Sequence, residues 1–307
     1  MDDRDGTVAA VRRAAHAKIN LYLHVCGRRD DGYHLLDSLV AFADIGDVVT
    51  AAPAPPGTLD LTVTGPFAPA LAAADGGGDP AGNLVLRAAR RLAAARGIAA
   101  PGAALTLEKN LPVASGIGGG SSDAAAALRA LAALWRLDHI GEDDLAEIGV
   151  ALGADVPVCL AARPTWLGGI GEDLRPAPAL PQAAIVLVNP GIPLATPPVF
   201  KARTGPFSAP ARFAGPPPSD AADLAAQLAE RRNDLTAAAV GLVPAIADVL
   251  ASLERSEGAL IARMSGSGAT CFALYAGRTA AEAAAARLRA AQPGWWVAAG
   301  MLGTRTG

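Results

Sequence analysis

A glycine-rich stretch that runs directly into a helix-forming segment is the feature that most constrains this chain. Residues 111–127 read LPVASGIGGGSSDAAAA, with four glycines and three serines ahead of an alanine run. Glycine adopts backbone angles closed to other residues and lets the main chain approach a ligand closely. The free N–H groups of the first helical turn then face any anion placed there. The stretch therefore predicts a loop that binds the phosphates of a nucleotide.

The elements on either side of the loop support this interpretation. Residues 105–108 alternate apolar and polar side chains as a strand does, and apolar residues after Asp123 recur on one face of a helix. Ser122 is a suitable helix cap, and Asp123 suits the positive end of the helix dipole. The alternative is a flexible linker, but glycine linkers are seldom set between a strand and an amphipathic helix.

Spacing argues against two common phosphate loops. A Walker A loop needs a lysine directly after its last glycine, whereas Gly120 is followed by two serines. A dinucleotide fingerprint needs a third glycine at a fixed interval, and counting from Gly116 or Gly118 reaches Ser121 or Asp123 instead. The loop therefore belongs to another class of phosphate site.

Composition bounds the class of protein. With 307 residues, 51% of them hydrophobic and 18% charged, the chain can bury one large or two moderate cores. A net charge of −3 provides no overall basic field for nucleic acid or an anionic membrane. Residues 1–13 lack the apolar core of a signal peptide, and Arg129 and Arg136 interrupt the apolar helix too early for a membrane span. We expect a soluble, cytoplasmic chain.

Cysteine and histidine usage gives little sign of a metal centre. Cys26, Cys159 and Cys271 are widely separated, with no C-x-x-C pair, and no two histidines have helical metal-ligand spacing. His34 differs from the other histidines because it stands beside Tyr33 in a turn-rich segment. Both side chains are therefore candidates to project into a site.

Mixed helices and strands without regular βαβ repeats predict an α+β fold. Strands are expected at 19–25, 48–51, 105–108, 184–190, 271–275 and 296–301. Helices are expected at 84–96, 123–137, 143–152, 220–232, 244–254 and 280–291. Residues 53–82 are predicted to form loops with short edge strands, and residues 205–218 a mobile surface loop.

Three segments, taken in order, resemble the motifs of a known superfamily. AHAKINLYLHV (15–25), the P-x-x-x-G-I-G-G-G-S-S-D-A arrangement (112–124) and MSGSGATCFALY (264–275) are similar to the three motifs of the galactokinase, homoserine kinase, mevalonate kinase and phosphomevalonate kinase (GHMP) superfamily. With GRRDDGYHLLDS (27–38) and LGADVPVCL (152–160), they are similar to the motifs of one kinase family within this superfamily. That family acts in non-mevalonate isoprenoid biosynthesis, on an acceptor that carries a cytidine diphosphate group.

The resemblance, which runs from about residue 15 to 302, implies an ATP-dependent small-molecule kinase. It implies an N-terminal ATP-binding domain (1–163) and a C-terminal ferredoxin-like domain on the substrate side (164–307), with the active site in the cleft between them. ATP with Mg²⁺ is the expected nucleotide, and the acceptor is a small molecule with a cytidine diphosphate group. A monomer or weak homodimer is expected, without nucleic acid or membrane.

Two residues are expected to carry the chemistry. Asp155 lies in a turn before Pro157 that can present a carboxylate, and it matches the catalytic aspartate of the family, although a turn-capping role would also fit the residues alone. Lys18 stands in an apolar run and matches a lysine near that aspartate. There it would keep the carboxylate ionised and stabilise developing negative charge. A solvated strand lysine is the alternative for Lys18.

The resemblance also assigns binding residues. The acceptor is expected to contact Asn20, Tyr33, His34, Thr196 and Phe200, with aromatic rings stacking on cytosine and His34 hydrogen bonding to its edge. The phosphates of ATP are expected at Pro112, Val113, Ala114, Ser115, Gly116, Ile117, Gly118, Gly119, Gly120, Ser121 and Ser122, and the adenosine near Asn83 and Lys109. Gly266 to Gly268 are expected to support the loop by close backbone approach. No protein ligand of Mg²⁺ is assigned, although Ser122 is a candidate.

Two rival functions remain at this point. A kinase of the same superfamily acting on homoserine or mevalonate would keep the phosphate loop but would not need an aromatic pocket at Tyr33, His34 and Phe200. A nucleotide-binding protein without activity would keep the loop and lose the base. The presence of both Lys18 and Asp155 counts against this second alternative.

Overall fold

The computed structural model describes residues 9–74 and 82–303, which divide into two compact units. The first unit contains residues 9–15, 46–74, 82–113 and 120–161, and the second contains 16–45, 114–119 and 162–303. The units are not contiguous because the long strands β1 (Val11–Arg28) and β2 (His34–Ala52) and the glycine loop each contribute to both. The division at residue 163 stays a prediction about sequence domains, and the compact units follow the chain differently.

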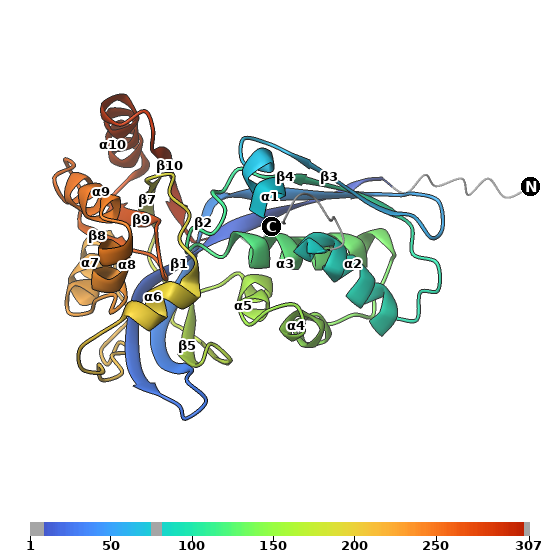
Figure 1. The fold of residues 1–307 in the computed structure, drawn as a ribbon, viewed down its shortest axis with the longest axis horizontal. Helices are drawn as coiled ribbons and strands as arrows, with labels where there is room; N and C mark the ends of the chain where they lie inside the picture. The colour runs from blue at the N-terminus through green and yellow to red at the C-terminus, as the bar shows by residue number, and fades with distance from the viewer. Residues whose placement is uncertain (1–8, 75–81, 304–307) are drawn as a thin grey trace, which may run out of the picture. The chain divides into compact units, whose positions relative to one another are not determined.

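The first unit combines a small sheet with helices (Figure 1). Its elements, besides the ends of β1 and β2, are β3 (Leu59–Thr64), β4 (Ala103–Glu108), α1 (Ala68–Ala74), α2 (Leu84–Ala95), α3 (Gly119–Leu134), α4 (Glu142–Val150) and α5 (Val156–Ala161). β4 pairs antiparallel with residues 48–52 of β2 and parallel with β3. α2 contacts β3 and α4, and α4 packs on α5.

A side-chain cap explains where α2 begins, whereas α3 begins earlier than the sequence predicted. Asn83 caps α2, since its side chain accepts a hydrogen bond from the N–H of Val85 at 2.9 Å. α3 starts at Gly119, four residues before the predicted start. Its residues from Ser122 to Leu128 are buried without interruption, whereas the pattern predicted one apolar face. Alanine is small enough for neighbouring elements to pack on several sides of the helix.

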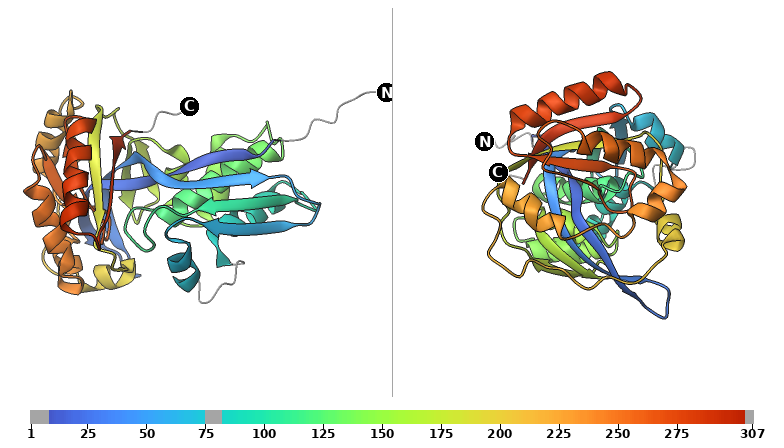
Figure 2. Two further views of the ribbon diagram at one scale, coloured as in Figure 1. Left: turned by 90° about the horizontal axis from the view of Figure 1, so that it is seen from above. Right: turned by 90° about the vertical axis from the view of Figure 1, so that its left-hand side faces the viewer.

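The second unit contains the remaining strands of the sheet (Figure 2). Its further elements are β5 (Thr165–Gly169), β6 (Asp173–Pro176), β7 (Ala183–Asn189), α6 (Thr196–Ala202), α7 (Ala221–Ala229), α8 (Thr236–Leu242), α9 (Ala245–Glu254), β8 (Ile261–Met264), β9 (Cys271–Tyr275), α10 (Arg278–Ala291) and β10 (Trp296–Leu302). β7, β8, β9 and β10 pair antiparallel in the spatial order β10-β7-β9-β8. α7, α9 and α10 pack on these strands. This is the ferredoxin-like arrangement that the resemblance implied.

Residues 205–218 form no helix or strand, as predicted, yet they are tied to the rest of the second unit. The N–H of Ser208 donates to the carbonyl of Val25 at 2.9 Å, and the N–H of Ala211 donates to Asp37 at 2.7 Å. The ring of Phe213 meets that of Trp166 edge-on, with centroids 5.3 Å apart. These contacts give the segment a defined path along β1 and β2.

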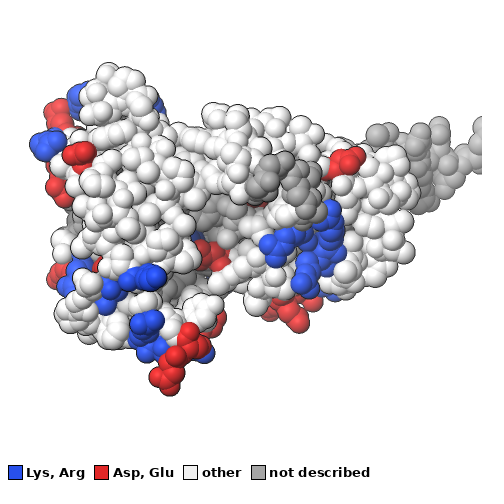
Figure 3. All heavy atoms as spheres, viewed as in Figure 1, with Lys and Arg blue, Asp and Glu red and all other residues white. Residues whose placement is uncertain are grey.

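Surface charge is mixed on the face shown in Figure 3, where Lys and Arg side chains gather over a limited area near α2. Arg87, Arg90 and Arg91 of that helix are exposed. Among the helices of residues 9–74 and 82–303, none combines the length and hydropathy needed to span a membrane.

Candidate active site

The glycine loop is held by direct backbone packing in the second unit. Gly116 and Gly118 have φ angles of 76° and 66°, in the left-handed region that favours glycine. A Cβ atom at Gly116 would lie 2.6 Å from the carbonyl oxygen of Gly268, and one at Gly266 would lie 2.7 Å from the carbonyl oxygen of Gly116. The expected close approach of the 266–268 segment to the loop is therefore confirmed.

Lys18 lies along the same loop. Its N–H donates to the carbonyl of Ile117 at 2.9 Å, and the residue is 6% exposed. A Cβ atom at Gly118 would stand 3.0 Å from Cβ and 3.3 Å from Cε of Lys18. Lys18 is therefore not a solvated strand lysine, because its stem fills the space beside the glycine loop.

The start of α3 differs from the prediction. Gly119 and Gly120 are its first residues, so Ser122 and Asp123 lie inside the helix and are buried. The hydroxyl of Ser122 donates to Sγ of Cys159 at 3.3 Å. Ser122 is therefore not the cap, and Asp123 is not the charge at the helix start. Both expectations were wrong because the glycines themselves enter the helix.

Asp123 belongs to a buried charge cluster of Lys109, Asp47 and Asp123. Nζ of Lys109 donates to both carboxylates, at 2.8 Å to Asp123. The other oxygen of Asp47 accepts from the N–H groups of Asn110 and Leu111 at 2.5 and 2.7 Å. The cluster thus joins β2, the end of β4 and the first turns of α3. Nothing in the local sequence around Asp47 indicated this role.

Two carboxylates share one ammonium in this cluster, and the pKa values respond to that. Burial, together with the neighbouring Asp47, raises the pKa of Asp123 to about 8 against the opposing effect of Lys109. Burial alone would lower the pKa of Lys109, but the two carboxylates offset this and raise it. The ammonium of Lys109 is paired with Asp47 and Asp123. The contact of Lys109 with adenosine stays a prediction, as does that of Asn83.

Asp155 immediately precedes the short helix α5 in the first unit. The residue is half-buried, and its carbonyl accepts the N–H of Cys159 at 3.1 Å. The carboxylate is thus carried at a turn, as the sequence indicated, and this turn leads into a helix that the sequence did not indicate. Its role as general base stays a prediction.

The structure brings two of the predicted acceptor residues into contact. The rings of His34 and Phe200 stack with centroids 5.1 Å apart and an interplanar angle of 30°. Tyr33, in contrast, is 60% exposed. Burial and the nearby guanidinium groups of Arg28 and Arg203 lower the pKa of His34. Its neutral imidazole therefore offers one donor and one acceptor at neutral pH.

The remaining two predicted acceptor residues meet the β8–β9 connection. The N–H of Asn20 donates to Oγ of Ser265 at 3.1 Å, and its side-chain amide donates to Ser38 at 2.8 Å. Oγ1 of Thr196 lies 2.9 Å from Oγ of Ser267. Sequence reasoning had given this connection a supporting role toward the phosphate loop and had missed both serines. The alternation of serine and glycine in SGSG was the available signal.

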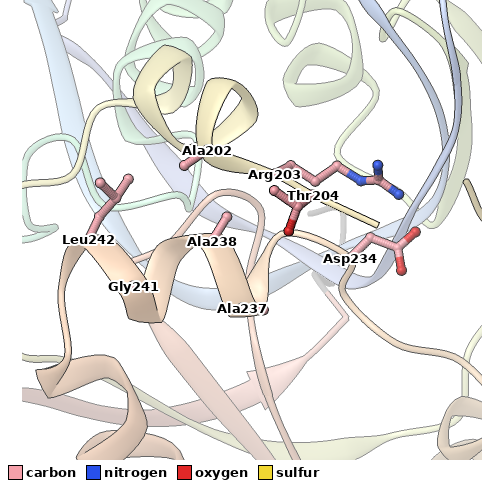
Figure 4. Close-up of a pocket in the computed structure, with 8 residues that line it drawn as sticks. All are labelled: Ala202, Arg203, Thr204, Asp234, Ala237, Ala238, Gly241 and Leu242. Carbon is pink, nitrogen blue, oxygen red and sulfur yellow. The ribbon is translucent and has the colours of Figure 1, made fainter. Parts of the chain in front are cut away.

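A separate hollow of about 320 Å³ lies between α6 and α8 (Figure 4). Arg203 and Asp234 stand at it, but Asp234 already pairs with Arg232 and accepts from Ser208. None of the predicted site residues lines this hollow. The hollow therefore lies outside the predicted site.

The described residues contain no cluster of side chains suited to a protein-borne metal ion. No three His, Cys, Asp or Glu side chains among residues 9–74 and 82–303 lie close enough to hold an ion. The Ser122 hydroxyl is buried against Cys159, and Lys109 occupies one oxygen of Asp123. The other oxygen of Asp123, Oδ1, is buried without a hydrogen-bond partner among the described residues.

Two family profiles match the chain. The profile described as GHMP kinases N terminal domain matches residues 83–163, and that described as GHMP kinases C terminal matches residues 218–294. A solved homoserine kinase from Cytophaga hutchinsonii superposes with a TM-score of 0.71 at 18% identity, covering 98% of this chain and 96% of that one. The fold and the glycine loop thus define a GHMP kinase, an ATP-dependent phosphotransferase.

Similarity along nearly the whole chain narrows the class. The 4-diphosphocytidyl-2-C-methyl-D-erythritol kinase of Paramagnetospirillum magneticum is 55% identical over 94% of this chain and 97% of its own length. That of Paracoccus denitrificans is 57% identical over 95% and 96%. A crystal structure of 4-(cytidine 5'-diphospho)-2C-methyl-D-erythritol kinase matches with a TM-score of 0.76 at 35% identity, covering 96% of this chain and all of that one. The chain belongs to the 4-diphosphocytidyl-2-C-methyl-D-erythritol kinase family.

Proposed function

We propose that this chain transfers the γ-phosphoryl group of ATP to the 2-hydroxyl of 4-diphosphocytidyl-2-C-methyl-D-erythritol, in the cytoplasmic non-mevalonate route to isoprenoid precursors. The observation that carries the proposal is the likeness to kinases of that name over nearly the whole chain. The packing of Lys18 on the glycine loop supports the chemistry. The contact between His34 and Phe200 supports an aromatic acceptor site.

The nucleotide phosphates bind at residues 112–122. The left-handed glycines Gly116 and Gly118 shape the backbone, and the N–H groups at the start of α3 face the anion. Mg²⁺ bound to the phosphates would offset part of their charge during transfer. Asn83 and Lys109 lie near the adenosine in this proposal.

Two side chains act on the reacting group. Asp155 accepts the proton of the 2-hydroxyl as the hydroxyl oxygen attacks the γ-phosphorus and the bond from that phosphorus to the departing ADP breaks. The alkoxide therefore does not have to form free in solution. The ammonium of Lys18 stabilises negative charge on the transferring phosphoryl group. The burial of Lys18 strengthens this effect, because its charge is less screened by water than a surface charge would be.

The acceptor is recognised through its cytosine. The base stacks on Phe200 and Tyr33, and the neutral ring of His34 hydrogen bonds to its edge. In this structure the His34 ring lies on Phe200. His34 must therefore leave that face before a base can stack there. Asn20 and Thr196 contact the rest of the acceptor.

An acceptor panel tests the proposed function. Consumption of ATP by the purified chain is measured with 4-diphosphocytidyl-2-C-methyl-D-erythritol, homoserine and mevalonate in parallel. Rapid consumption with the cytidine compound alone is expected. Turnover of homoserine or mevalonate at a higher rate would assign the chain to another branch of the superfamily, and no turnover with any acceptor would contradict kinase activity.

A further inference from the structure

Asn233 is a buried side chain outside the predicted site whose polar atoms are all engaged. It lies between α7 and α8 and is 5% exposed. Its amide nitrogen donates to the carbonyl oxygens of Met264 and Gly266, both at 2.8 Å. Its amide oxygen accepts the N–H of Leu235 at 2.9 Å. Asn233 thus connects a local turn to the end of β8 and the start of the β8–β9 connection (265–270).

The β8–β9 connection is in turn packed on the phosphate loop. The N–H of Thr270 donates to the carbonyl of Ser115 at 3.1 Å, and the hydroxyl of Ser265 donates to the carbonyl of Gly116 at 3.2 Å. A Cβ atom at Gly266 would stand 2.7 Å from the carbonyl oxygen of Gly116. At Gly116 and Gly266 the two backbones therefore meet directly. A shift of the connection would therefore displace the loop or break these bonds.

The same connection reaches the residues assigned to the acceptor. Ser265 accepts the N–H of Asn20, and Ser267 shares a hydrogen bond with Thr196 at 2.9 Å. Ser265 therefore touches the phosphate loop on one side and Asn20 on the other. One short segment contacts the predicted residues of both substrates, and Asn233 holds that segment from behind.

We propose that Asn233 is a positioning residue for both substrates, because it fixes the β8–β9 connection on which the phosphate loop and the acceptor residues rest. Its own atoms do not have to touch ATP or the acceptor for this role. If the amide donors are lost, two buried carbonyl oxygens lose their partners. The connection then relaxes to find other partners, and the loop moves with it. The acceptor half of this inference rests on the proposed function, whereas the nucleotide half does not.

The first variant is Asn233→Asp, which keeps the shape of the side chain and an oxygen for the N–H of Leu235. It replaces the donor to Met264 and Gly266 with an oxygen that repels their carbonyls. Asn233→Ala removes both interactions without adding charge and provides a second variant if the first does not fold. Tyr275→Phe is the matched control, because it removes a buried hydroxyl bond to Ser256 in the same unit and leaves the connection untouched.

Calorimetric titration with ATP, without acceptor, measures the nucleotide half. Circular dichroism and thermal unfolding show that each variant is folded. We expect the Kd for ATP to rise about tenfold or more in both Asn233 variants, because the apparent Kd rises as the population of the binding-competent loop conformation falls. The Tyr275→Phe variant should lose thermal stability and keep the Kd of the wild type.

Steady-state kinetics measures the acceptor half. Both Asn233 variants should raise KM for the acceptor as well as for ATP, whereas Ser267→Ala, which breaks only the bond to Thr196, should raise the acceptor KM alone. Folded Asn233 variants with lower thermal stability but wild-type Kd and KM would overturn the proposal, since that is the result of a merely structural role. If the wild type binds ATP but phosphorylates no cytidine compound, the proposed function fails, and the titrations still decide the role of Asn233.

Discussion

Gly118 leaves the space that the stem of Lys18 occupies. A Cβ atom at position 118 would stand 3.0 Å from Cβ of Lys18, closer than ordinary van der Waals contact. The glycine therefore serves two purposes, since its φ angle of +66° also lies in the left-handed region. The path of the Lys18 stem along the loop depends on this contact.

Gly118→Ala separates these two purposes when it is compared with Gly57→Ala. Gly57 has a φ angle of +83° but nothing within 4 Å of a Cβ atom. Both variants should lose about 1–2 kcal/mol of stability from left-handed backbone strain. Only Gly118→Ala also displaces Lys18, so its turnover should fall about 10- to 100-fold. Equal turnover of the two variants would show that the contact has no part in catalysis.

Asp155→Asn tests the proposed general base. The amide cannot accept the hydroxyl proton, so kcat should fall by about 10²- to 10⁴-fold while both substrates still bind. Stopped-flow or steady-state rates are compared with calorimetric Kd values for ATP. The control is Asp143→Asn, which removes an exposed carboxylate from α4 in the same unit. Near-normal turnover of Asp155→Asn would remove Asp155 from the mechanism.

The buried cluster predicts a pH effect on stability. The pKa of Asp123 is raised from 3.8 to about 8 by burial and by Asp47, against the opposing effect of Lys109. Between these two values the folded chain holds a proton that the unfolded chain has released. Its stability therefore falls as pH rises through this window and stays low above the folded pKa.

Asp123→Asn removes this dependence, because an amide does not titrate. Thermal unfolding of wild type and variant is measured from pH 5 to pH 8, and the comparison is between slopes. The melting temperature of the wild type should fall more steeply with pH than that of Asp123→Asn. Asp143→Asn, which removes an exposed carboxylate, should keep the wild-type slope. Parallel curves for wild type and Asp123→Asn would contradict the raised pKa.

Phe200→Ala tests the proposed aromatic acceptor site. Loss of one stacking ring should weaken acceptor binding by about 1–3 kcal/mol, the range for base–aromatic stacking, and leave the affinity for ATP unchanged. Phe213→Ala is a useful control, since it removes a ring of the same unit that packs on Trp166. An unchanged acceptor KM in Phe200→Ala would place the cytosine elsewhere.

The fold was predictable where strands are long apolar runs and helices have clear ends. β7, β9, β10, α2 and α10 fall close to their predicted positions. The sequence did not indicate β8, which has four residues, or α6 and α8, which have seven each. Such short elements have too few residues to show a periodicity, and their packing against other elements of the second unit decides their conformation.

The site divides in a similar way. The phosphate loop was visible because glycine has few other reasons to cluster before a helix. The cluster of Lys109, Asp47 and Asp123 was not, because each residue lies on a different element and only the folded chain brings them together. Asn233 was missed for the same reason, since its partners Met264 and Gly266 are far along the chain.

The comparison of kcat/KM for the cytidine and uridine forms of the acceptor tests the central claim most directly. The purified wild type is assayed with ATP and each diphosphonucleosyl methylerythritol, with free methylerythritol phosphate as a third acceptor. If a cytosine site anchors the hydroxyl for phosphoryl transfer, the cytidine form should be preferred over the uridine form by about tenfold or more, and the free phosphate should be a very poor acceptor. Equal efficiency with the cytidine and uridine forms, or faster turnover of the free phosphate, would contradict the account.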